Sequence, residues 1–501
     1  MARDILKEIV DRRKEDIQKN SISFGFDIPK ARTRKVHPFL AEKGVILEVK
    51  RASPSKGDIA PSLDAEKTAK SYAQAGAKAI SCLTETNYFK GTLGDLMAVC
   101  KAVDDFEAET GRPGPAVLRK DFLLSADEVE VAFRAGADAV LLISRILDTD
   151  TMAQMAKKCE ELGMTALIEL RTEEDCEKLS HVVQAASREH IVCGVNSRDL
   201  RDFSIDLLTP CRILSHIQRV MGENARVIFE SGIRTARSAS FVGSLGFAGL
   251  LLGEAAAKNP GIRKELVSSF TVSPETPNAR FWRKIAVLTK NSTRPLAKIC
   301  GLPNESDARK AAELGADALG FIFWEKSPRK AQADTVRALK DLQKLKIGVI
   351  VAPKLPESKE AIALVKAGDL DALQIHTISG AREFLSSEEL CALPHYCAVN
   401  IKSQADIAAL DELFEKGEPR VLVDAQAGDK IGGTGTTVAE ELVPLVQKKY
   451  KLWLAGGITD GNVERIVRQF SPELVDTASG VEKEAGIKDH GKLERFFRAI
   501  G

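Results

Sequence analysis

The 501-residue chain contains short apolar runs that recur about every 20 to 35 residues, and segments with a helical period separate them. The runs do not alternate with polar residues, which is typical of strands buried on both faces, and such strands form parallel sheets covered by helices. The first half has eight runs, at residues 45–50, 79–83, 116–120, 139–144, 165–170, 191–196, 226–231 and 249–253. The second half has another eight, at residues 297–301, 318–323, 346–351, 372–376, 397–401, 420–424, 452–456 and 474–478. Eight strands in each half favour closure into a barrel.

The sequence therefore predicts the α/β class, with two fused (β/α)8 TIM barrels, the first carrying an N-terminal helical extension. Three internal echoes support a duplication, because each places a glycine at a helix end just before a strand. They are AGAKAI at 75–80, AGADAVLL at 135–142 and LGADALGF at 314–321.

The expected domains are a first barrel over 1–270, a linker over 271–294 and a second barrel over 295–501. The linker is predicted from Pro, Ser, Thr and Asn at both ends and the lack of a clear period, although its Phe281 and Trp282 suggest that part of it packs. Residues 1–43 form the predicted extension, and its charged run Arg12, Arg13 and Lys14 is expected on a solvated face.

The composition limits the classes of partner that the chain is expected to bind. The chain has 72 basic and 71 acidic residues, a net charge of +1, so bulk electrostatics give no support for binding nucleic acid or an anionic membrane. No segment approaches the roughly 20 apolar residues of a membrane span, and the first residues lack the apolar run of a signal peptide. The nine cysteines have no Cys-x-x-Cys pair and no metal-ligand spacing, which predicts no metal site and favours a reducing cytoplasm. Protein partners and oligomeric state stay open.

Charged residues end several buried runs of the first half, where an unpaired ion costs several kcal/mol. The carboxyl ends of barrel strands meet at one face, so these side chains are expected in one cavity, although each alone could be an ion pair with a neighbouring element. Two lysines among three carboxylates can hold an anionic substrate and move protons. The candidates are Glu48, Lys50, Lys120, Glu169 and Glu230, with Asn196 and Arg198 nearby.

The second half ends its runs with a different set. Cys300 ends the first strand and Asp424 the sixth, while Arg329 follows the second. A lone cysteine is more often a small buried hydrophobe, but Lys298 and a facing Asp424 make a reactive thiolate a hypothesis. His376, on the fourth strand, is interpreted as a hydrogen-bonded core or rim histidine rather than a base.

Glycine turns after the last strands of each half predict phosphate binding, because backbone amides approach an anion closely where no side chain intervenes. The loop 432–435 adds further amides but lacks the Lys-Ser/Thr ending of a nucleotide loop, so ATP is not implied. The residues concerned are Ser231, Gly232, Gly253, Gly433, Gly457, Ser479 and Gly480.

These residues lie in motifs that resemble a fused bifunctional enzyme of tryptophan biosynthesis. The first half resembles indole-3-glycerol-phosphate synthase through LEVKRASPSKG, LRKDF, LIEL, GVNSRDL and FESGI. The second half resembles phosphoribosylanthranilate isomerase through KICGL, SPRK, LQIH, VDAQAGDKIGGTG, LAGGI and DTASGVE followed by GIKDH. The resemblance implies phosphorylated small-molecule substrates and no metal or organic cofactor.

The synthase resemblance implies that Lys120 is the general acid at the substrate's ketone and that Glu169 assists proton removal in the later dehydration. Lys50 would position the anthranilate carboxylate or the phosphate, and Ser53 would also contact substrate. The remaining positions would hold hydroxyls (Glu48, Asn196, Glu230) or lie near the phosphate (Arg198, Ser231, Gly232, Gly253).

The isomerase resemblance implies an Amadori rearrangement in which Asp424 protonates the ribose ring oxygen and Cys300 removes the C2 proton. Arg329 would hold the anthranilate carboxylate, with Gly457, Ser479 and Gly480 at the phosphate. His376 and Gly433 are also expected to bind substrate.

Three positions depart from the family patterns: Glu254, where many synthases have a small hydroxyl residue, and Thr377 and Thr436 in the isomerase half. Two alternatives remain: a pair of barrels acting on another phosphoribosyl metabolite, and a chain in which one barrel is a binding or scaffolding module. Cys300 and Lys120 oppose the first alternative, because an aspartate pair would be expected there.

Overall fold

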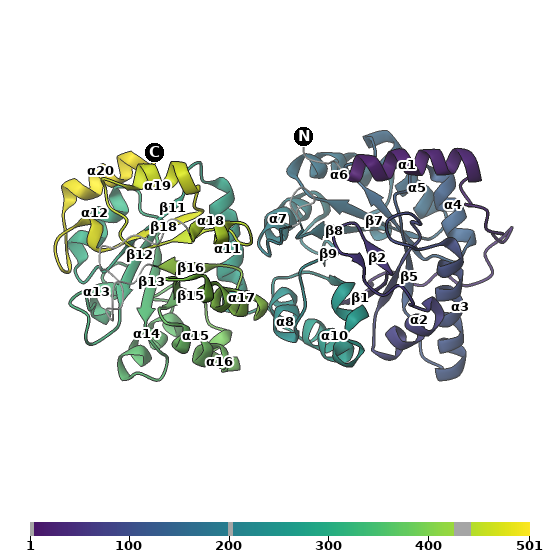
Figure 1. Ribbon diagram of the computed structural model, residues 1–501. Coiled ribbons are helices and arrows are strands. Elements are labelled where there is room, and N and C mark those ends of the chain that lie inside the picture. The colour runs from purple at the N-terminus through teal and green to yellow at the C-terminus, as the bar shows by residue number, and fades with distance from the viewer. Residues whose placement is uncertain (1–4, 199–203, 425–441) are drawn as a thin grey trace. The chain divides into compact units, whose positions relative to one another are not determined.

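The computed structural model describes residues 5–198, 204–424 and 442–501. The chain divides into two compact units, Met1–Pro274 and Glu275–Gly501, called unit 1 and unit 2 below. Each unit contains a closed barrel of eight parallel strands with helices outside it (Figure 1). The sixteen predicted strands all form, so the two fused barrels are confirmed.

Unit 1 closes in the order β1-β10-β9-β8-β7-β6-β5-β4. Its barrel strands are β1 (Gly44–Val49), β4 (Ala79–Leu83), β5 (Ala116–Lys120), β6 (Ala139–Ile143), β7 (Thr165–Leu170), β8 (Ile191–Asn196), β9 (Val227–Glu230) and β10 (Gly249–Leu252), and β2 (Ala52–Ser53) pairs with β3 (Gly57–Asp58) in the loop after β1. The helices are α1 (Ile5–Asn20), α2 (Ala65–Gln74), α3 (Leu93–Thr110), α4 (Ala126–Arg134), α5 (Thr149–Glu161), α6 (Glu173–Ala185), α7 (Thr209–Met221), α8 (Ala236–Ser244), α9 (Glu254–Lys258) and α10 (Arg263–Thr271), with short 3-10 turns η1 (Arg188–His190) and η2 (Pro260–Ile262).

Unit 2 closes in the order β11 to β18 around the barrel. Its strands are β11 (Leu296–Cys300), β12 (Ala318–Ile322), β13 (Leu345–Ile350), β14 (Ala372–Ile375), β15 (His395–Asn400), β16 (Val421–Asp424), β17 (Trp453–Leu454) and β18 (Leu474–Thr477), followed by the pair β19 (Glu482–Glu484) and β20 (Ile487–Lys488). The helices are α11 (Pro277–Asn291), α12 (Glu305–Glu313), α13 (Ala333–Arg337), α14 (Pro356–Ala367), α15 (Ile378–Leu385), α16 (Glu388–Cys391), α17 (Ile407–Glu415), α18 (Val443–Gln447), α19 (Val463–Phe470) and α20 (His490–Ile500), with 3-10 turns η3 (Gln404–Asp406) and η4 (Ser479–Val481).

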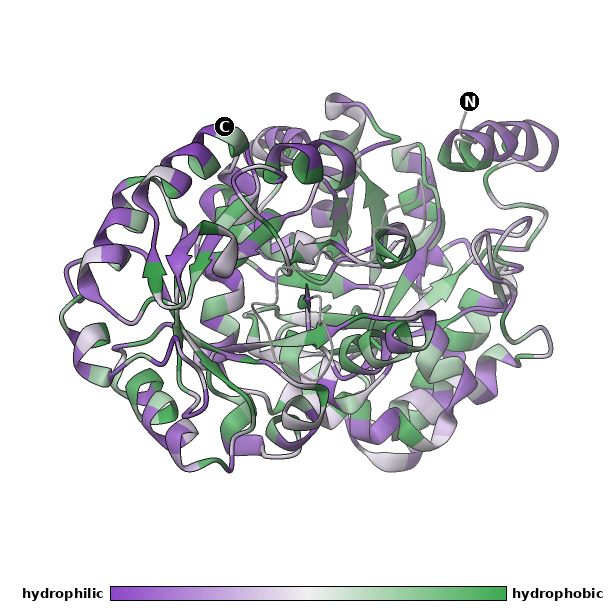
Figure 2. Ribbon diagram, turned by 60° about the vertical axis from the view of Figure 1, so that its left-hand side comes forward, coloured by the Kyte–Doolittle hydropathy of each residue, from purple (hydrophilic) through white to green (hydrophobic). Residues whose placement is uncertain are grey.

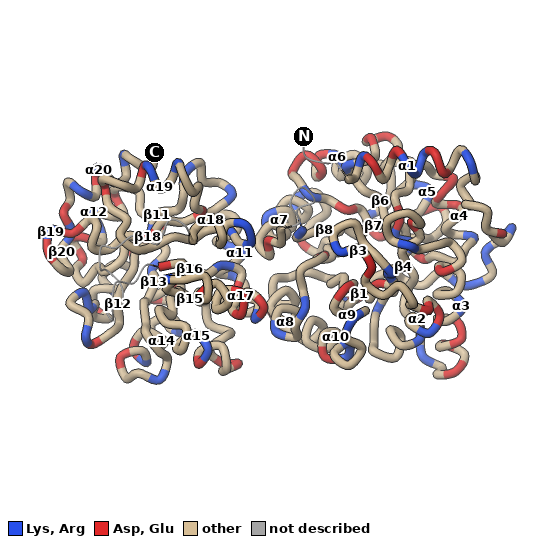
Figure 3. Tube along the Cα trace, viewed as in Figure 1, with Lys and Arg blue, Asp and Glu red and all other residues tan. Residues whose placement is uncertain are grey.

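The barrel strands are buried on both faces, as in β1, where every position is buried. Figure 2 shows the strands mostly hydrophobic, while the helices carry both hydrophobic and hydrophilic residues. The charged residues belong largely to helices and loops (Figure 3). The three echoed glycines, Gly76, Gly136 and Gly315, all have left-handed φ, between 89° and 111°, which ends the preceding helix and turns the chain into the next strand.

The expectation that the whole charged run of α1 lies on a solvated face is wrong for one residue. Arg13 is buried rather than solvated, since it forms ion pairs with Asp121, at 2.6 Å, and with Glu128. Arg12 on the same helix is exposed and pairs with Glu15, as expected for a solvated face. Arg13 thereby fastens α1 to the chain just after Lys120.

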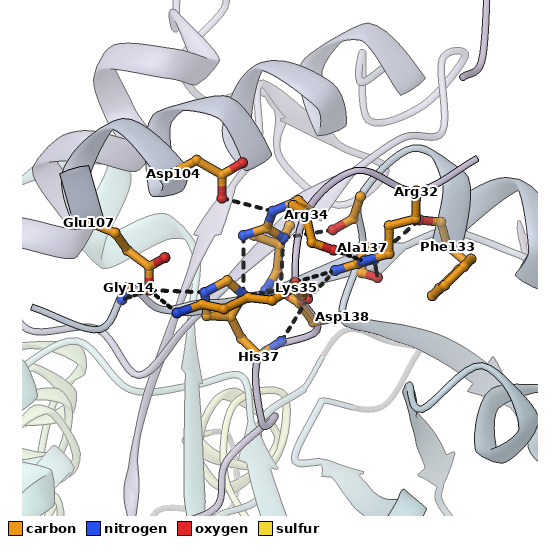
Figure 4. A network of polar contacts seen from close by, with 12 residues as sticks. Arg32, Arg34, Lys35, His37, Asp104, Glu107, Gly114, Phe133, Ala137 and Asp138 are labelled. Carbon is orange, nitrogen blue, oxygen red and sulfur yellow. Dashed lines mark hydrogen bonds and ion pairs between the residues drawn. The ribbon is translucent and has the colours of Figure 1, made fainter. Parts of the chain in front are cut away.

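The segment between α1 and β1 has no regular structure, and side chains fix it to the barrel instead (Figure 4). Arg32 and Arg34 both donate to the buried carboxylate of Asp138, at 2.6 and 3.1 Å, and Asp138 precedes β6. His37 binds the same carboxylate through its backbone amide and contacts Glu107 through its ring. This network holds the extension at the amino-terminal end of the barrel.

The segment expected as a linker contains a helix. Thr276 caps α11, Pro277 occupies its first turn, and the helix belongs to unit 2. Trp282 is fully buried and its ring lies 5.7 Å from that of Trp453 on β17. The helix is therefore part of the second barrel's core, which explains the packing expected of Phe281 and Trp282.

Candidate active sites

Unit 1 has a cavity of about 210 Å³ at the carboxyl ends of its strands, called the unit 1 cavity below. Parallel closure brings these strand ends together, although their residues are far apart in the sequence. Every candidate predicted in the first half lines it: Glu48, Lys50, Ser53, Lys120, Glu169, Asn196, Arg198, Glu230, Ser231, Gly232 and Gly253.

Two ion pairs organise the cavity. Lys120 on β5 donates to Glu230 on β9 at 2.9 Å, and Lys50 donates to Glu48 on β1. Glycines make room for both pairs: a Cβ on Gly194 would lie 2.4 Å from Glu230 Oε1, and one on Gly253 would lie 2.7 Å from Glu48 Oε1. The glycine in β8 and the glycine after β10 thus leave space for these two carboxylates.

The protonation of these groups follows from burial and from one another. Burial opposes the charge on Lys120, but the carboxylates of Glu230, Glu48 and Glu169 outweigh it and raise the lysine's pKa. Burial raises the pKa of Glu169, and the nearby Glu230 raises it further, against the effect of Lys120. For Glu48, burial is outweighed by Lys50 and Lys120, and its pKa is lowered. The cavity therefore holds a charged lysine beside a carboxyl group that is easily protonated.

The turn after β9 is a candidate anion site. Ser231 and Gly232 follow each other with left-handed φ of 74° and 84°, and both line the cavity at the carboxyl end of β9. Gly253 caps α9, and Glu254, the departure noted above, lines the cavity and pairs with Lys258 at 2.8 Å. Burial lowers the pKa of Arg198, which Glu254 partly offsets. Glu254 thus lies near the arginine expected at the phosphate.

Sequence reasoning missed several residues of this cavity. Ile5, Leu6 and Ile9 of α1 form part of its wall, and Phe89 and Phe122 add aromatic surface. Four cations also line it: Lys56, Arg145, Arg171 and Arg234. These cations could have been expected from the sequence, because each lies in a loop that follows a predicted strand, at the face where the carboxyl ends of the strands meet.

In unit 2, Cys300 ends β11, Asp424 ends β16 and His376 follows β14. His376 Nδ1 lies 3.2 Å from Gln374 Nε2, and its Nε2 lies 3.5 Å from Asp424 Oδ2. Burial, and then Lys298, lowers the pKa of His376 to about 4, so the ring is neutral. Because the amide nitrogen of Gln374 donates to Nδ1, the proton of the neutral ring lies on Nε2, which is buried and makes no hydrogen bond to the described residues. This agrees with the interpretation of His376 as a hydrogen-bonded rim histidine.

The surroundings of Cys300 do not favour the reactive thiolate that was hypothesised from the sequence. Burial raises the thiol's pKa, and Lys298 opposes this only in part. Lys298 is itself engaged, since it donates to Asp476 at 2.6 Å and to Gln374 at 3.0 Å. Gly320 leaves space for the sulfur, because a Cβ there would lie 2.7 Å from Cys300 Sγ. Unit 2 by itself holds Cys300 as a thiol at neutral pH.

Arg329 is held by a carboxylate of the protein. Its guanidinium makes a forked contact with Glu482, at 2.9 and 2.8 Å, and its side chain lies against Gly301, next to Cys300. Glu482 also accepts from the buried Lys488 at 2.9 Å, and Lys488 donates to the Cys300 carbonyl at 2.6 Å. Nothing in the sequence indicated that Glu482 and Lys488 hold Arg329 and the end of β11 in place.

The remaining isomerase-half candidates lie at the ends of β17 and β18. Gly457 has φ of 62°, and a Cβ on Gly480 would lie 1.9 Å from the Ile458 carbonyl, so the two turns touch. Thr377 caps α15 by accepting from the Gly380 amide, which gives this departure a structural role. Gly433 and Thr436 lie outside the described residues.

The described residues contain no group of three or more His, Cys, Asp and Glu placed to hold a metal ion. Within the same residues, no helix is long and apolar enough to cross a membrane.

Comparison with known proteins assigns the two units. The family model of indole-3-glycerol phosphate synthase matches residues 6–268, and that of N-(5'-phosphoribosyl)anthranilate isomerase matches residues 297–499. The tryptophan biosynthesis protein TrpCF of Vibrio cholerae is 31% identical, over 91% of this chain and 86% of that protein. The multifunctional tryptophan biosynthesis protein of Schizosaccharomyces pombe is 29% identical over 92% of this chain, which spans 60% of its length. The chain therefore belongs to the bifunctional indole-3-glycerol phosphate synthase and phosphoribosylanthranilate isomerase enzymes of tryptophan biosynthesis, with the synthase in unit 1 and the isomerase in unit 2.

Proposed function

We propose that the two units catalyse consecutive reactions with the residues described above. Unit 2 isomerises N-(5-phosphoribosyl)anthranilate to 1-(2-carboxyphenylamino)-1-deoxyribulose 5-phosphate. Unit 1 converts that product to indole-3-glycerol phosphate with loss of CO2 and water. The observation that carries the proposal is the charged Lys120, held by Glu230 in a cavity that gathers every candidate of the first half.

In the synthase reaction, Lys120 donates a proton to the ketone oxygen as the ring carbon attacks. The high pKa of Lys120 keeps it charged, so it stabilises the negative charge that develops on that oxygen. Decarboxylation restores the aromatic ring, and Glu169 takes up a proton during the dehydration that follows. The amides at Ser231, Gly232 and Gly253 hold the phosphate.

In the isomerase reaction, Asp424 donates a proton to the ribose ring oxygen, and the ring opens to a Schiff base. The Cys300 thiolate then removes the C2 proton, and the resulting enolamine rearranges to the ketone. Nε2 of the neutral His376 lies 3.5 Å from Asp424 Oδ2, and its proton stabilises the Asp424 carboxylate after proton transfer. Arg329, fixed by Glu482, lies beside Cys300 to receive the anthranilate carboxylate. The turns at Gly457, Ser479 and Gly480 hold the phosphate.

A coupled assay tests both assignments. The full chain, supplied with N-(5-phosphoribosyl)anthranilate alone, should form indole-3-glycerol phosphate through the deoxyribulose intermediate. Intermediate that accumulates without indole-glycerol phosphate would leave unit 2 active and contradict the synthase. Conversion only of added intermediate would contradict the isomerase.

All nine cysteines are thiols, and eight of them are buried. A reducing compartment keeps such thiols unpaired. We therefore propose that the enzyme acts in the cytoplasm.

A further inference from the structure

Glu169 and Glu230 compete for the positive charge of Lys120. Lys120 donates to Glu230 at 2.9 Å, so the lysine's hydrogen bond goes to the other carboxylate of the pair. Glu169 is buried, and both burial and Glu230 raise its pKa. Two carboxyl groups that share one lysine favour a proton on one of them. A base for the dehydration must nevertheless be ionised near neutral pH.

Arg171 lies two residues after Glu169 and lines the same cavity. Its amide donates to Asp175 Oδ2 at 2.8 Å, at the capped start of α6, which fixes the backbone. Its guanidinium donates to the Arg198 carbonyl, at the end of β8. Its Nε is buried and has no partner among the described residues. The guanidinium is therefore held at the cavity wall without a carboxylate bonded to it.

The groups with the largest influence on Glu169 come from several elements, and Arg171 is one of the two cations among them. Lys120 and Arg171 favour the ionised carboxylate, whereas Glu230 and Asp175 oppose it. Other ionisable groups lining the cavity are Glu48 and Lys50 from β1, Lys56, Asp121, Arg145, Arg198, Arg234 and Glu254.

We propose that Arg171 is a positioning residue of the synthase site, which keeps Glu169 ionised and ties the end of β7 to the end of β8. The inference rests on the proposed role of Glu169. It adds a residue whose charge, rather than its contact with substrate, sets the pH range in which the synthase works.

The test is the pH dependence of synthase kcat in the full chain, with the carboxyphenylamino-deoxyribulose phosphate supplied directly. In Arg171→Gln the acid limb should move up by about one pH unit, because a nearby opposite charge lowers a carboxyl pKa by about 1–3 units. Arg171→Lys keeps the charge but loses the forked donor, so its acid limb should stay near that of the wild type while kcat falls. The temperature at which synthase activity is lost on heating, compared with that of the wild type, reports whether unit 1 has folded in each variant.

Arg145→Gln is the matched control, because it removes a cation that lines the same cavity from the loop after β6 and is not among the largest influences on Glu169. Its acid limb should not move. An unmoved limb in Arg171→Gln, or an equal shift in both variants, would overturn the proposal. If Arg171→Gln is too slow for kinetics, the infrared band of the protonated carboxyl that Glu169→Gln lacks should persist to higher pH than in the wild type, and an equal midpoint would overturn the proposal. An inactive wild-type synthase would instead contradict the proposed function.

Discussion

The two barrels share a topology, but the protonation of their candidate proton-transfer residues is set by different influences. Unit 1 gathers lysines and carboxylates in one cavity, so each group's protonation is set by its charged neighbours. Unit 2 places Cys300 and His376 where burial is the largest influence, and burial favours the neutral form of both. The same fold therefore sets the protonation of its candidate residues in two ways, mainly by neighbouring charges in unit 1 and mainly by burial in unit 2. The variants below test whether this contrast holds.

The largest effect is expected for Lys120→Ala. This change removes both the acid and the positive charge at the ketone oxygen, and losing a positioned acid alone costs about 10²- to 10⁴-fold. Synthase kcat should fall by at least that factor, and isomerase should stay within a few-fold. Lys78→Ala, at an exposed lysine paired with Glu42, is the control. Near-normal synthase in Lys120→Ala would remove the acid role.

Asp424→Asn should lower isomerase by a comparable factor, because the amide keeps the shape but has no carboxylic proton to donate. Synthase, measured with its own substrate, should be unchanged. An equimolar mixture with Lys120→Ala should restore the two-step conversion, since each mutant supplies the missing activity and the intermediate diffuses. Loss of both activities from either single change would contradict two independent sites.

Arg13→Met should destabilise unit 1 alone. It leaves Asp121 and Glu128 buried without their shared partner, and breaking a buried pair in this way costs about 3–5 kcal/mol. On heating, synthase should be lost at a lower temperature than in the wild type, while isomerase is lost at the same temperature. Arg12→Met removes an exposed pair worth about 0–1 kcal/mol and should change neither. A matching loss in both variants would show that burial of Arg13 is not what matters.

The sequence was enough to predict the strands, because runs buried on both faces have few other structures to form. It also predicted the first-half cavity, since barrel closure dictates that strand ends meet. What it could not supply were partners distant along the chain: Asp121 lies 108 residues from Arg13, and Glu482 lies 153 residues from Arg329. Helix α11 was missed for a local reason. Its capping Thr276 and Pro277 suggested a loop, although the buried Asn278, Trp282 and Ile285 have helical spacing.

A smaller effect is expected from pH on the isomerase. In the proposed mechanism Cys300 acts as a thiolate, and burial raises its pKa above the ordinary thiol value. The active form is therefore scarce at neutral pH, and the isomerase rate should rise with pH and level off only above the usual thiol range. Alkylation should remove isomerase and spare synthase, with the partly exposed Cys391→Ala variant responding like the wild type. Isomerase that persists in Cys300→Ala would return this cysteine to a packing role.

The smallest change is expected when the chain is divided between Pro274 and Glu275. Each barrel closes on its own eight strands, so residues 1–274 should keep synthase and residues 275–501 should keep isomerase, each within a few-fold of the intact chain.

The position of the cut matters. A fragment that starts at residue 292 lacks α11 and leaves Trp453 without Trp282, and burying one such aromatic side chain contributes about 1.5–3 kcal/mol. Its isomerase should therefore be lost at a lower temperature than that of 275–501. Equal thermal stability of the two fragments would show that α11 is a dispensable connection after all, and loss of activity from 275–501 itself would show that the second barrel needs the first in order to fold.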